Sequence, residues 1–218
     1  MTESQVFELA VDRHAVYAFI GYLILLISIG LYSARFSSSG ISEFFIGGRK
    51  MNKVVIALSA VVSGRSAWLL LGVTGLVYVQ GASAIWAVVG YTVVELILFL
   101  TYAKKLREFS EEHDCITVPD FFAERFGDKT GTLRSILIIT FLIFMVSYVS
   151  AQFVAGGKAF SSSFGIEQNT GVLLSAVIIL AYTVLGGFLA VSLTDAFQAF
   201  FMIFALVFLP FIAIQDLG

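Results

Sequence analysis

The sequence predicts an all-α membrane protein with six transmembrane helices, on three observations. The 218-residue chain is 59% hydrophobic and only 13% charged, whereas soluble domains are near half apolar and a quarter charged. Its mean hydropathy is +0.96. Its charged residues cluster between long apolar runs and are nearly absent within them, as expected where lipid is the solvent. A soluble fold is a poor alternative, because its apolar positions would alternate with a polar face.

The six apolar segments are each about 17–26 residues long, enough to cross a hydrocarbon layer of about 30 Å with some tilt. They are residues 14–34, 54–79, 84–103, 133–155, 171–187 and 191–214. We expect them to form one transmembrane domain over residues 1–218. The stretch before the first segment is acidic rather than basic, so we expect no signal peptide and a retained first helix.

The basic residues predict an orientation. The first and third loops hold ten of the thirteen Lys and Arg residues, and the opposite side holds only Arg13 and Lys158. Because cytoplasmic loops carry an excess of Lys and Arg, we place these two loops in the cytoplasm and the N-terminus outside the inner (plasma) membrane. The thirteenth basic residue, Arg65, then lies inside a membrane segment.

A short helix is expected in the third loop, over residues 117–126. Thr117 is a plausible N-cap, and Pro119 fits the first turn. The phenylalanines that follow alternate with charged residues, which favours an amphipathic helix on the cytoplasmic interface. Packing of this helix against the transmembrane bundle is an equally fair interpretation.

The composition argues against several other classes of protein. A net charge of −2 gives no indication of nucleic-acid binding. The single Cys115 cannot form an internal disulfide. The sequence holds no metal-binding cluster or phosphate loop, and no later segment holds a histidine that could activate Ser63 as a nucleophile. We therefore predict that the protein is not an enzyme.

The second segment holds the strongest candidate for a functional site. An Arg at the centre of a membrane helix costs from about 2.5 to more than 10 kcal/mol, so Arg65 should face protein or water. Gly64 and the neighbouring serines would ease a break in this helix. Broken helices free backbone carbonyls that coordinate cations and helix N-termini that attract carboxylates, as in many secondary transporters. The alternative is a kinked helix whose Arg65 pairs with a carboxylate in an absent part of the protein. Glu95, in the third segment, could be a proton or cation site or the partner of Arg65.

Three further features have both a functional and a structural interpretation. Tyr148 and Gln152 lie on one helix face at i, i+4 spacing, where they could line a solute path or form interhelical hydrogen bonds. The pair Gly186-Gly187 allows a close approach of backbones or a turn. Asp195, after Thr194, is most simply the start of the sixth segment.

Several short motifs occur in order along the chain. They are Phe45-Ile46-Gly47-Gly48-Arg49, Leu58-Ser59-Ala60, Trp68-Leu69-Leu70-Leu71-Gly72, Thr117-Val118-Pro119-Asp120-Phe121-Phe122, and Gly186-Gly187-Phe188-Leu189-Ala190-Val191-Ser192 with Asp195 and Gln198. Together they resemble the sodium:solute symporter family, and within it the sodium/proline symporter branch. The resemblance runs from about residue 14 to 214.

The resemblance implies a LeuT-like fold, in which a leading helix precedes two inverted five-helix repeats. The first segment would be the leading helix, and the other five would form the first repeat. Family members are more than twice as long, so the chain resembles an N-terminal fragment whose missing partner is the C-terminal repeat of the same protein.

The resemblance also implies site residues. Sodium would be held by the backbone carbonyls of Val62 and Arg65 together with hydroxyls of the missing repeat. The solute pocket would be lined by Arg65, Ser66, Trp68 and Tyr148. Arg49 and Asp195 match cytoplasmic-side positions that affect coupling in the proline branch.

One position departs from the proline branch, which carries an acidic residue in the broken helix where this chain has Gly64 followed by Arg65. The leading hypothesis is a sodium-coupled symporter of proline or a related amino acid, with the proton as the alternative coupling ion. The alternatives are a symporter for another carboxylate solute, and the membrane sensor module of a symporter-like kinase.

Overall fold

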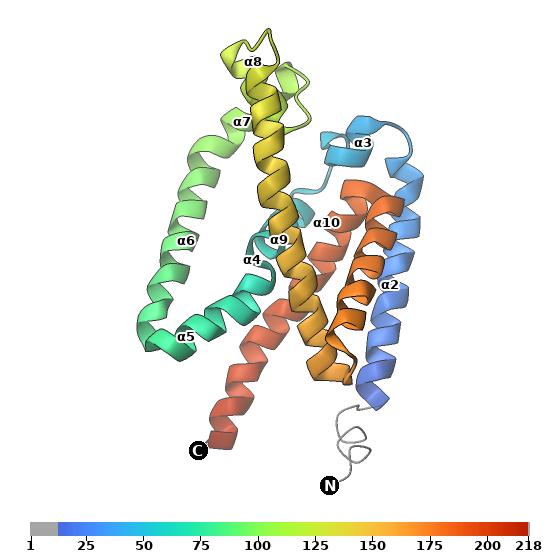
Figure 1. Ribbon diagram of the computed structural model, residues 1–218, viewed down its shortest axis with the longest axis vertical. Helices are drawn as coiled ribbons and strands as arrows, with labels where there is room; N and C mark the ends of the chain where they lie inside the picture. The colour runs from blue at the N-terminus through green and yellow to red at the C-terminus, as the bar shows by residue number, and fades with distance from the viewer. Residues whose placement is uncertain (1–12, 218) are drawn as a thin grey trace. The chain divides into compact units, whose positions relative to one another are not determined.

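The computed structural model describes residues 13–217, and all regular structure in that part of the chain is helical (Figure 1). The predicted all-α class is confirmed for these residues. Four helices are long and apolar enough to cross a membrane: Arg13–Ser37, Leu71–Glu112, Thr132–Phe164 and Gln168–Gln215. The stretch before residue 13, on which the signal-peptide argument rests, lies outside the described residues.

The four long helices do not coincide one to one with the six predicted segments. A break at Ser66 divides the segment 54–79, and its second part belongs to the helical run Leu71–Glu112. The segments 171–187 and 191–214 fall within a single helical run of 48 residues. Six crossings therefore stay a prediction. The described residues form two compact units, residues 13–66 with 153–217 (unit 1) and Ala67–Gln152 (unit 2).

Unit 1 begins with α2 (Arg13–Ser37), an almost wholly apolar helix with Arg35 in its last turn. After α3 (Ile41–Ile46) and the short turn η1 (Gly47–Arg49), α4 (Lys53–Ala67) follows. Asn52 caps α4, because its Oδ1 accepts a hydrogen bond from the backbone N–H of Val54 at 2.8 Å.

The helix α10 (Gln168–Leu217) reverses direction at Gly187, and its two halves run in opposite directions (Figure 1). Gly187 has φ 57° and ψ −150°, a conformation that is essentially restricted to glycine. A Cβ here would also lie 2.6 Å from the carbonyl oxygen of Phe44. Both the turn and the close approach that the sequence suggested for this glycine pair are thus present.

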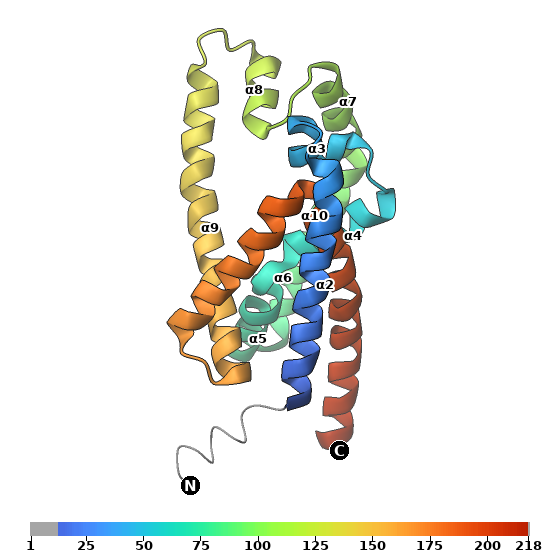
Figure 2. The same cartoon turned by 90° about the vertical axis from the view of Figure 1, so that its right-hand side faces the viewer.

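The helix α2 packs along α10 with little space between them (Figure 2). A Cβ on Gly30 would lie 3.1 Å from the Cβ of Tyr182, and one on Gly186 would lie 2.8 Å from the carbonyl oxygen of Gly30. Ser37 Oγ donates a hydrogen bond to the carbonyl oxygen of Gly186 at 2.5 Å. Small residues therefore bring the leading helix into backbone contact with the reversal of α10.

The last part of α9 (Thr132–Phe164) also belongs to unit 1 and packs closely on the start of α10. A Cβ on Gly157 would lie 2.8 Å from the carbonyl oxygen of Gln168. The two helices follow each other after a short connection, so glycine serves the tight hairpin between them.

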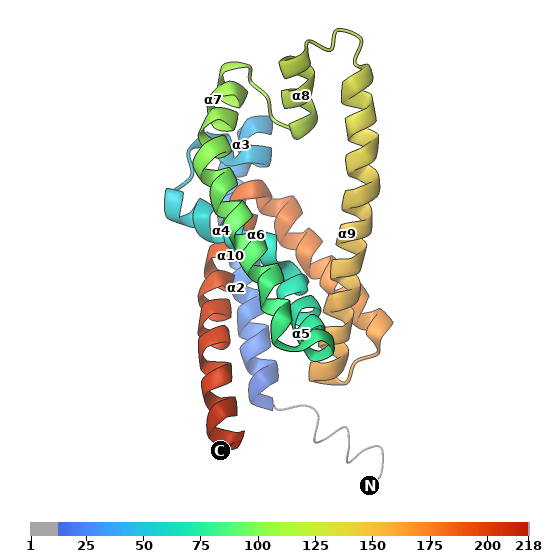
Figure 3. The ribbon, with the colours of Figure 1, turned by 90° about the vertical axis from the view of Figure 1, so that its left-hand side faces the viewer.

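Unit 2 contains a second reversal, at Gly81 with φ 69° and ψ −154°. The π-helix η2 (Trp68–Val73) and the short α-helix α5 (Thr74–Gln80) come before it. After it, η3 (Gly81–Ala84), α6 (Ile85–Leu98), η4 (Phe99–Ala103) and α7 (Lys104–Glu112) continue as one helical run (Figure 3).

The expected loop helix is α8 (Val118–Phe126), and its start is a capping box. Thr117 Oγ1 accepts from the backbone N–H of Asp120 at 3.2 Å, and Asp120 Oδ2 accepts from the backbone N–H of Thr117 at 3.0 Å. The predicted Thr117 cap is confirmed. Arg134 forms an ion pair with Asp120 and so ties the start of α9 to α8.

Candidate functional site

The candidate site begins at the break in α4. Ser66 has φ 42° and ψ −159°, where an L residue costs on the order of 1–3 kcal/mol. The predicted break is therefore confirmed, but it falls at Ser66, two residues after Gly64. Strain of this kind persists only where the surrounding structure holds it, and it concentrates at functional sites.

Val62 and Arg65, whose backbone carbonyls were expected to bind sodium, lie just before the break at Ser66. Val62, Arg65 and Ser66 are all half-buried at the end of α4. In many secondary transporters, an interrupted membrane helix of this kind presents backbone carbonyl oxygens to a cation. A hard cation such as sodium is coordinated by oxygen atoms of this type. Among the described residues no group of three His, Cys, Asp or Glu could form a conventional metal site.

The residues after the break lie in unit 2. The backbone N–H of Ala67 donates to Gln152 Oε1 of α9 at 3.2 Å, so Gln152 forms the interhelical hydrogen bond that was one of its two interpretations. Tyr148 lies one turn earlier on the same helix and is 46% exposed. Trp68 is 42% exposed, with its ring centroid 6.3 Å from that of Tyr91.

Asp195 is the buried carboxylate of unit 1. Its side chain accepts hydrogen bonds at Oδ2 from Ser59 Oγ at 2.7 Å and from Ser63 Oγ at 3.0 Å. Asp195 is 9% exposed and Ser59 is 8% exposed. A buried carboxylate requires such partners, and the two serines provide them from one face of α4 at i, i+4 spacing.

The interpretation of Asp195 as a helix start is wrong. The second half of α10 begins after Gly187, so Asp195 lies about two turns inside it, against α4. Thr194 does not cap the helix either, because its hydroxyl donates back to the carbonyl oxygen of Val191 at 2.8 Å. Sequence reasoning missed Ser59 and Ser63 as partners of Asp195. The spacing of the serines was visible, but a partner 136 residues away was not.

Two other residues of the sequence motifs, Gln198 and Arg49, also belong to unit 1. Gln198 lies one turn after Asp195, and its Nε2 donates to Tyr22 Oη, so α2 is also bound to the second half of α10. Arg49 is half-buried at the end of η1 with φ 57°, after Gly47 and Gly48 in the same left-handed region. A Cβ on Gly47 would lie 3.4 Å from the ring of Phe188, so η1 is in contact with α10 just after its reversal.

Comparison with known proteins identifies the family. The profile of the sodium:solute symporter family matches residues 44–218. The chain is 40% identical over 198 residues to the sodium/proline symporters of Staphylococcus aureus strains JH9 and COL. The match covers 90% of this chain and 39% of each relative, so the chain spans about two fifths of their length. No solved structure gives a significant match. With its long apolar helices, the chain is an integral membrane protein, and it belongs to the sodium:solute symporter family.

Proposed function

We propose that the whole protein is a symporter that couples sodium entry to the uptake of proline or a related amino acid. The observation that carries the proposal is the interruption of α4 at Ser66, in a chain of this family. An interrupted membrane helix provides carbonyls for a cation and a helix N-terminus for a carboxylate within a few residues. A symporter needs both a cation site and a solute site. The proposed function includes no enzymatic reaction.

Six membrane crossings account best for the helices. The runs Leu71–Glu112 and Gln168–Gln215 have 42 and 48 residues, and an α-helix of 20 residues already spans the hydrocarbon core. Each run holds a glycine at which the chain reverses, Gly81 and Gly187. With α4 joined to α5 across the break, the leading helix and five further crossings result. This is the number expected for a leading helix and one repeat of a LeuT-like fold.

The substrate and sodium would bind at neighbouring positions around the break in α4. In this proposal the carbonyls of Val62 and Arg65 bind sodium, while the Arg65 guanidinium and Ser66 bind the amino-acid carboxylate. Trp68 and Tyr148 would contact the apolar part of the solute, since both expose much of their aromatic rings. Occupation of one site would then favour the conformation that binds the other, which is the condition for coupling.

Asp195 and Arg49 would act on the cytoplasmic side of this site. The two serines that donate to Asp195 belong to α4, the helix that holds the sodium carbonyls. A cation leaving the break toward Asp195 would meet a carboxylate that α4 itself orients. This orientation rests on the Lys and Arg bias of the loops, which places η1 in the cytoplasm and the N-terminus outside.

The second five-helix repeat would come from the rest of the protein. The relatives are about two and a half times as long as the region matched here. Such a repeat would supply the remaining sodium ligands and cover the polar groups at the break, whose exposure to lipid would cost several kcal/mol.

Equilibrium binding of tritiated proline to the full-length protein at increasing sodium concentration tests the proposal. Arg65→Ala should weaken binding about ten- to a hundredfold, because charge-assisted hydrogen bonds to the carboxylate are lost. Arg65→Lys should retain part of the affinity. Arg107→Ala is the matched control, because Arg107 pairs with Glu111 on the surface of α7.

Unchanged proline binding in Arg65→Ala would contradict the assigned role of this residue. Binding that needs no sodium but rises with proton concentration would favour proton coupling. Binding of a different carboxylate solute with the same Arg65 dependence would favour the symporter of another substrate. Tight binding without any uptake would favour the sensor module.

A further inference from the structure

A cavity of about 520 Å³ lies within unit 1, away from the break in α4. It is formed by the end of α2, the connection from α3 to α4, and the first two turns of α10 after its reversal. Its lining combines the polar side chains Arg35, Lys50 and Asn52 with the apolar side chains Val55, Leu189 and Leu193. None of these six residues belongs to the proposed solute or sodium site.

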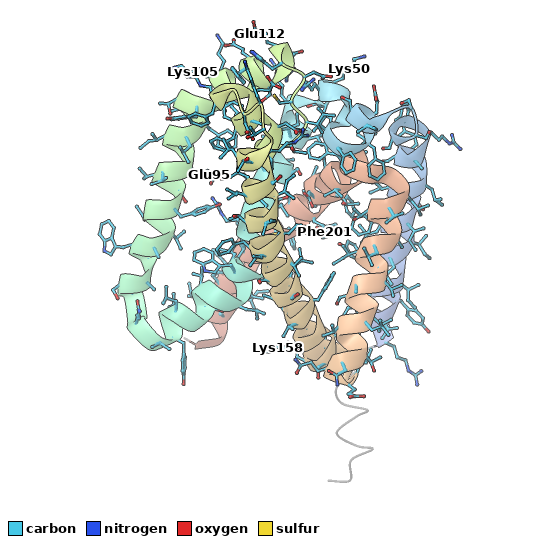
Figure 4. All side chains as sticks on the ribbon, turned by 45° about the horizontal axis from the view of Figure 1, so that its top comes forward. Lys50, Glu95, Lys105, Glu112, Lys158 and Phe201 are labelled. Atoms are coloured by element: carbon cyan, nitrogen blue, oxygen red, sulfur yellow. The ribbon has the colours of Figure 1, made fainter. Side chains whose placement is uncertain are left out.

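The cavity is placed at the boundary between lipid and water. α2 is a 25-residue apolar helix that ends at Ser37, so its last turn reaches the headgroup layer. Exposed apolar side chains surround this end of unit 1: Phe36 is 52% exposed, Phe45 59% and Val54 65%. Figure 4 shows Lys50 in the connection between α3 and α4, at the same end of the unit.

The lining carries a positive excess. Arg35 and Lys50 are both exposed, and neither forms a salt bridge within residues 13–217. Glu43 is the only carboxylate among the lining residues, which leaves a net charge of +1. Asn52 uses its Oδ1 to cap α4, so its amide NH₂ faces outward as a donor beside the positive end of that helix.

The two serine hydroxyls of the lining already donate hydrogen bonds to backbone carbonyls. Ser37 Oγ donates to the carbonyl oxygen of Gly186, and Ser39 Oγ donates to that of Phe36 at 2.6 Å. The donors that remain are two cationic side chains and one amide, which suit a singly charged phosphodiester. A soluble phosphate would leave the apolar side chains of the lining in contact with water. The acyl chains of a lipid would cover these side chains.

We propose that this cavity binds the phosphate headgroup of an anionic phospholipid, held by Arg35 and Lys50. Basic pockets between transmembrane helices on the cytoplasmic side bind anionic headgroups in other membrane proteins. A lipid bound here contacts α2, α4 and α10 together, and so acts on the helix that carries the break. The inference does not depend on the proposed solute or coupling ion.

Native mass spectrometry of the detergent-solubilised full-length protein, titrated with phosphatidylglycerol or phosphatidylcholine, tests the proposal. The expected result is tighter binding of phosphatidylglycerol. Arg35→Gln with Lys50→Gln should lose about fivefold in affinity for each basic side chain, about 25-fold for the pair. The charge-matched control, Lys53→Gln with Lys105→Gln, should stay within about twofold of the unmodified protein, because neither residue lines the cavity.

Three outcomes would overturn the proposal: no preference for phosphatidylglycerol, an equal loss in the two double variants, or full competition by glycerol 3-phosphate. The last would mean that the cavity takes a soluble phosphate. Unchanged phosphatidylcholine binding by the Arg35, Lys50 variant shows that it is folded. If the double variant does not fold, the single variants Arg35→Gln and Lys50→Gln are measured instead. Each should lose about fivefold in affinity for phosphatidylglycerol.

Discussion

At the scale of single residues, Ser66 combines a strained backbone with a position at the end of α4, near the middle of the apolar segment 54–79. Glycine would adopt φ 42° without strain, yet the chain places its glycine two residues earlier and a serine at the break. A serine here places a hydroxyl at the break, at a cost on the order of 1–3 kcal/mol. Strain of this kind is expected where a site requires a specific side chain.

Asp195 is buried between the second half of α10 and the serines of α4. Asp195→Asn keeps an oxygen that accepts from Ser59 and Ser63 but removes the negative charge. If the carboxylate attracts sodium, the sodium concentration for half-maximal uptake by the full-length protein should rise about tenfold, which corresponds to about 1.4 kcal/mol. The half-saturating proline concentration at saturating sodium should change much less.

The matched control for Asp195→Asn is Ser59→Ala with Ser63→Ala, which removes both donors and leaves the charge. This variant should be less stable by about 1–3 kcal/mol, because a buried carboxylate loses its partners. A normal sodium dependence in Asp195→Asn would contradict the assigned role in coupling.

At the scale of elements, two reversals and one break determine the arrangement of the helices. The break at Ser66 was predicted from Gly64, Arg65 and the serines, because the cost of a buried charge is visible in sequence. The sequence left two interpretations of Gly186-Gly187 open, a turn or a close approach of backbones, because glycine pairs serve both. The hydrogen bond from Ala67 to Gln152 was likewise one of two readings, since a sequence does not say which helices are neighbours.

Replacing the glycine at the α10 reversal should destabilise unit 1. Gly187→Ala places a Cβ 2.6 Å from the carbonyl oxygen of Phe44 and strains the backbone at φ 57°. We expect a loss of more than about 2 kcal/mol, measured as a lower thermal unfolding temperature in detergent. Gly21→Ala, in α2, is the control, because a Cβ there meets nothing within 4 Å. Equal stability of the two variants would contradict the described reversal.

The start of α8 should depend on pH. Burial alone would raise the pKa of Asp120, but hydrogen bonds from Thr117 and the charge of Arg134 outweigh it and hold the pKa below its ordinary value. A lowered pKa means that the charged form stabilises the fold above the ordinary Asp pKa of about 4, and that this contribution is lost as pH falls through the lowered pKa.

Asp120→Asn should therefore lower stability at pH 7 by about 0.5–2 kcal/mol, the value of a helix cap. Its difference from the unmodified protein should shrink as the pH is lowered below about 4. Thermal unfolding at both pH values measures this. Glu124→Gln on the exposed side of the same helix is the control. A difference that persists unchanged at pH 3 would show that the charge of Asp120 does not stabilise α8.

At the scale of the whole molecule, composition alone predicted the membrane class, since lipid admits few charges in long helices. The ordered motifs predicted the family, which the comparisons confirm. The partners of Asp195 and the cavity beside Arg35 and Lys50 could not be predicted, because both depend on residues brought together from distant parts of the chain. The number of crossings and the second repeat remain predictions of the account.

Uptake of radiolabelled proline into vesicles that contain the full-length protein tests whether sodium entry drives proline transport. An inward sodium gradient should drive accumulation above the external concentration, and vesicles without the gradient should only equilibrate. Vesicles that contain only residues 1–218 should show no uptake, because in the proposed function a second repeat supplies the remaining sodium ligands. Absence of proline accumulation by the full-length protein under a sodium gradient would contradict sodium-coupled proline symport.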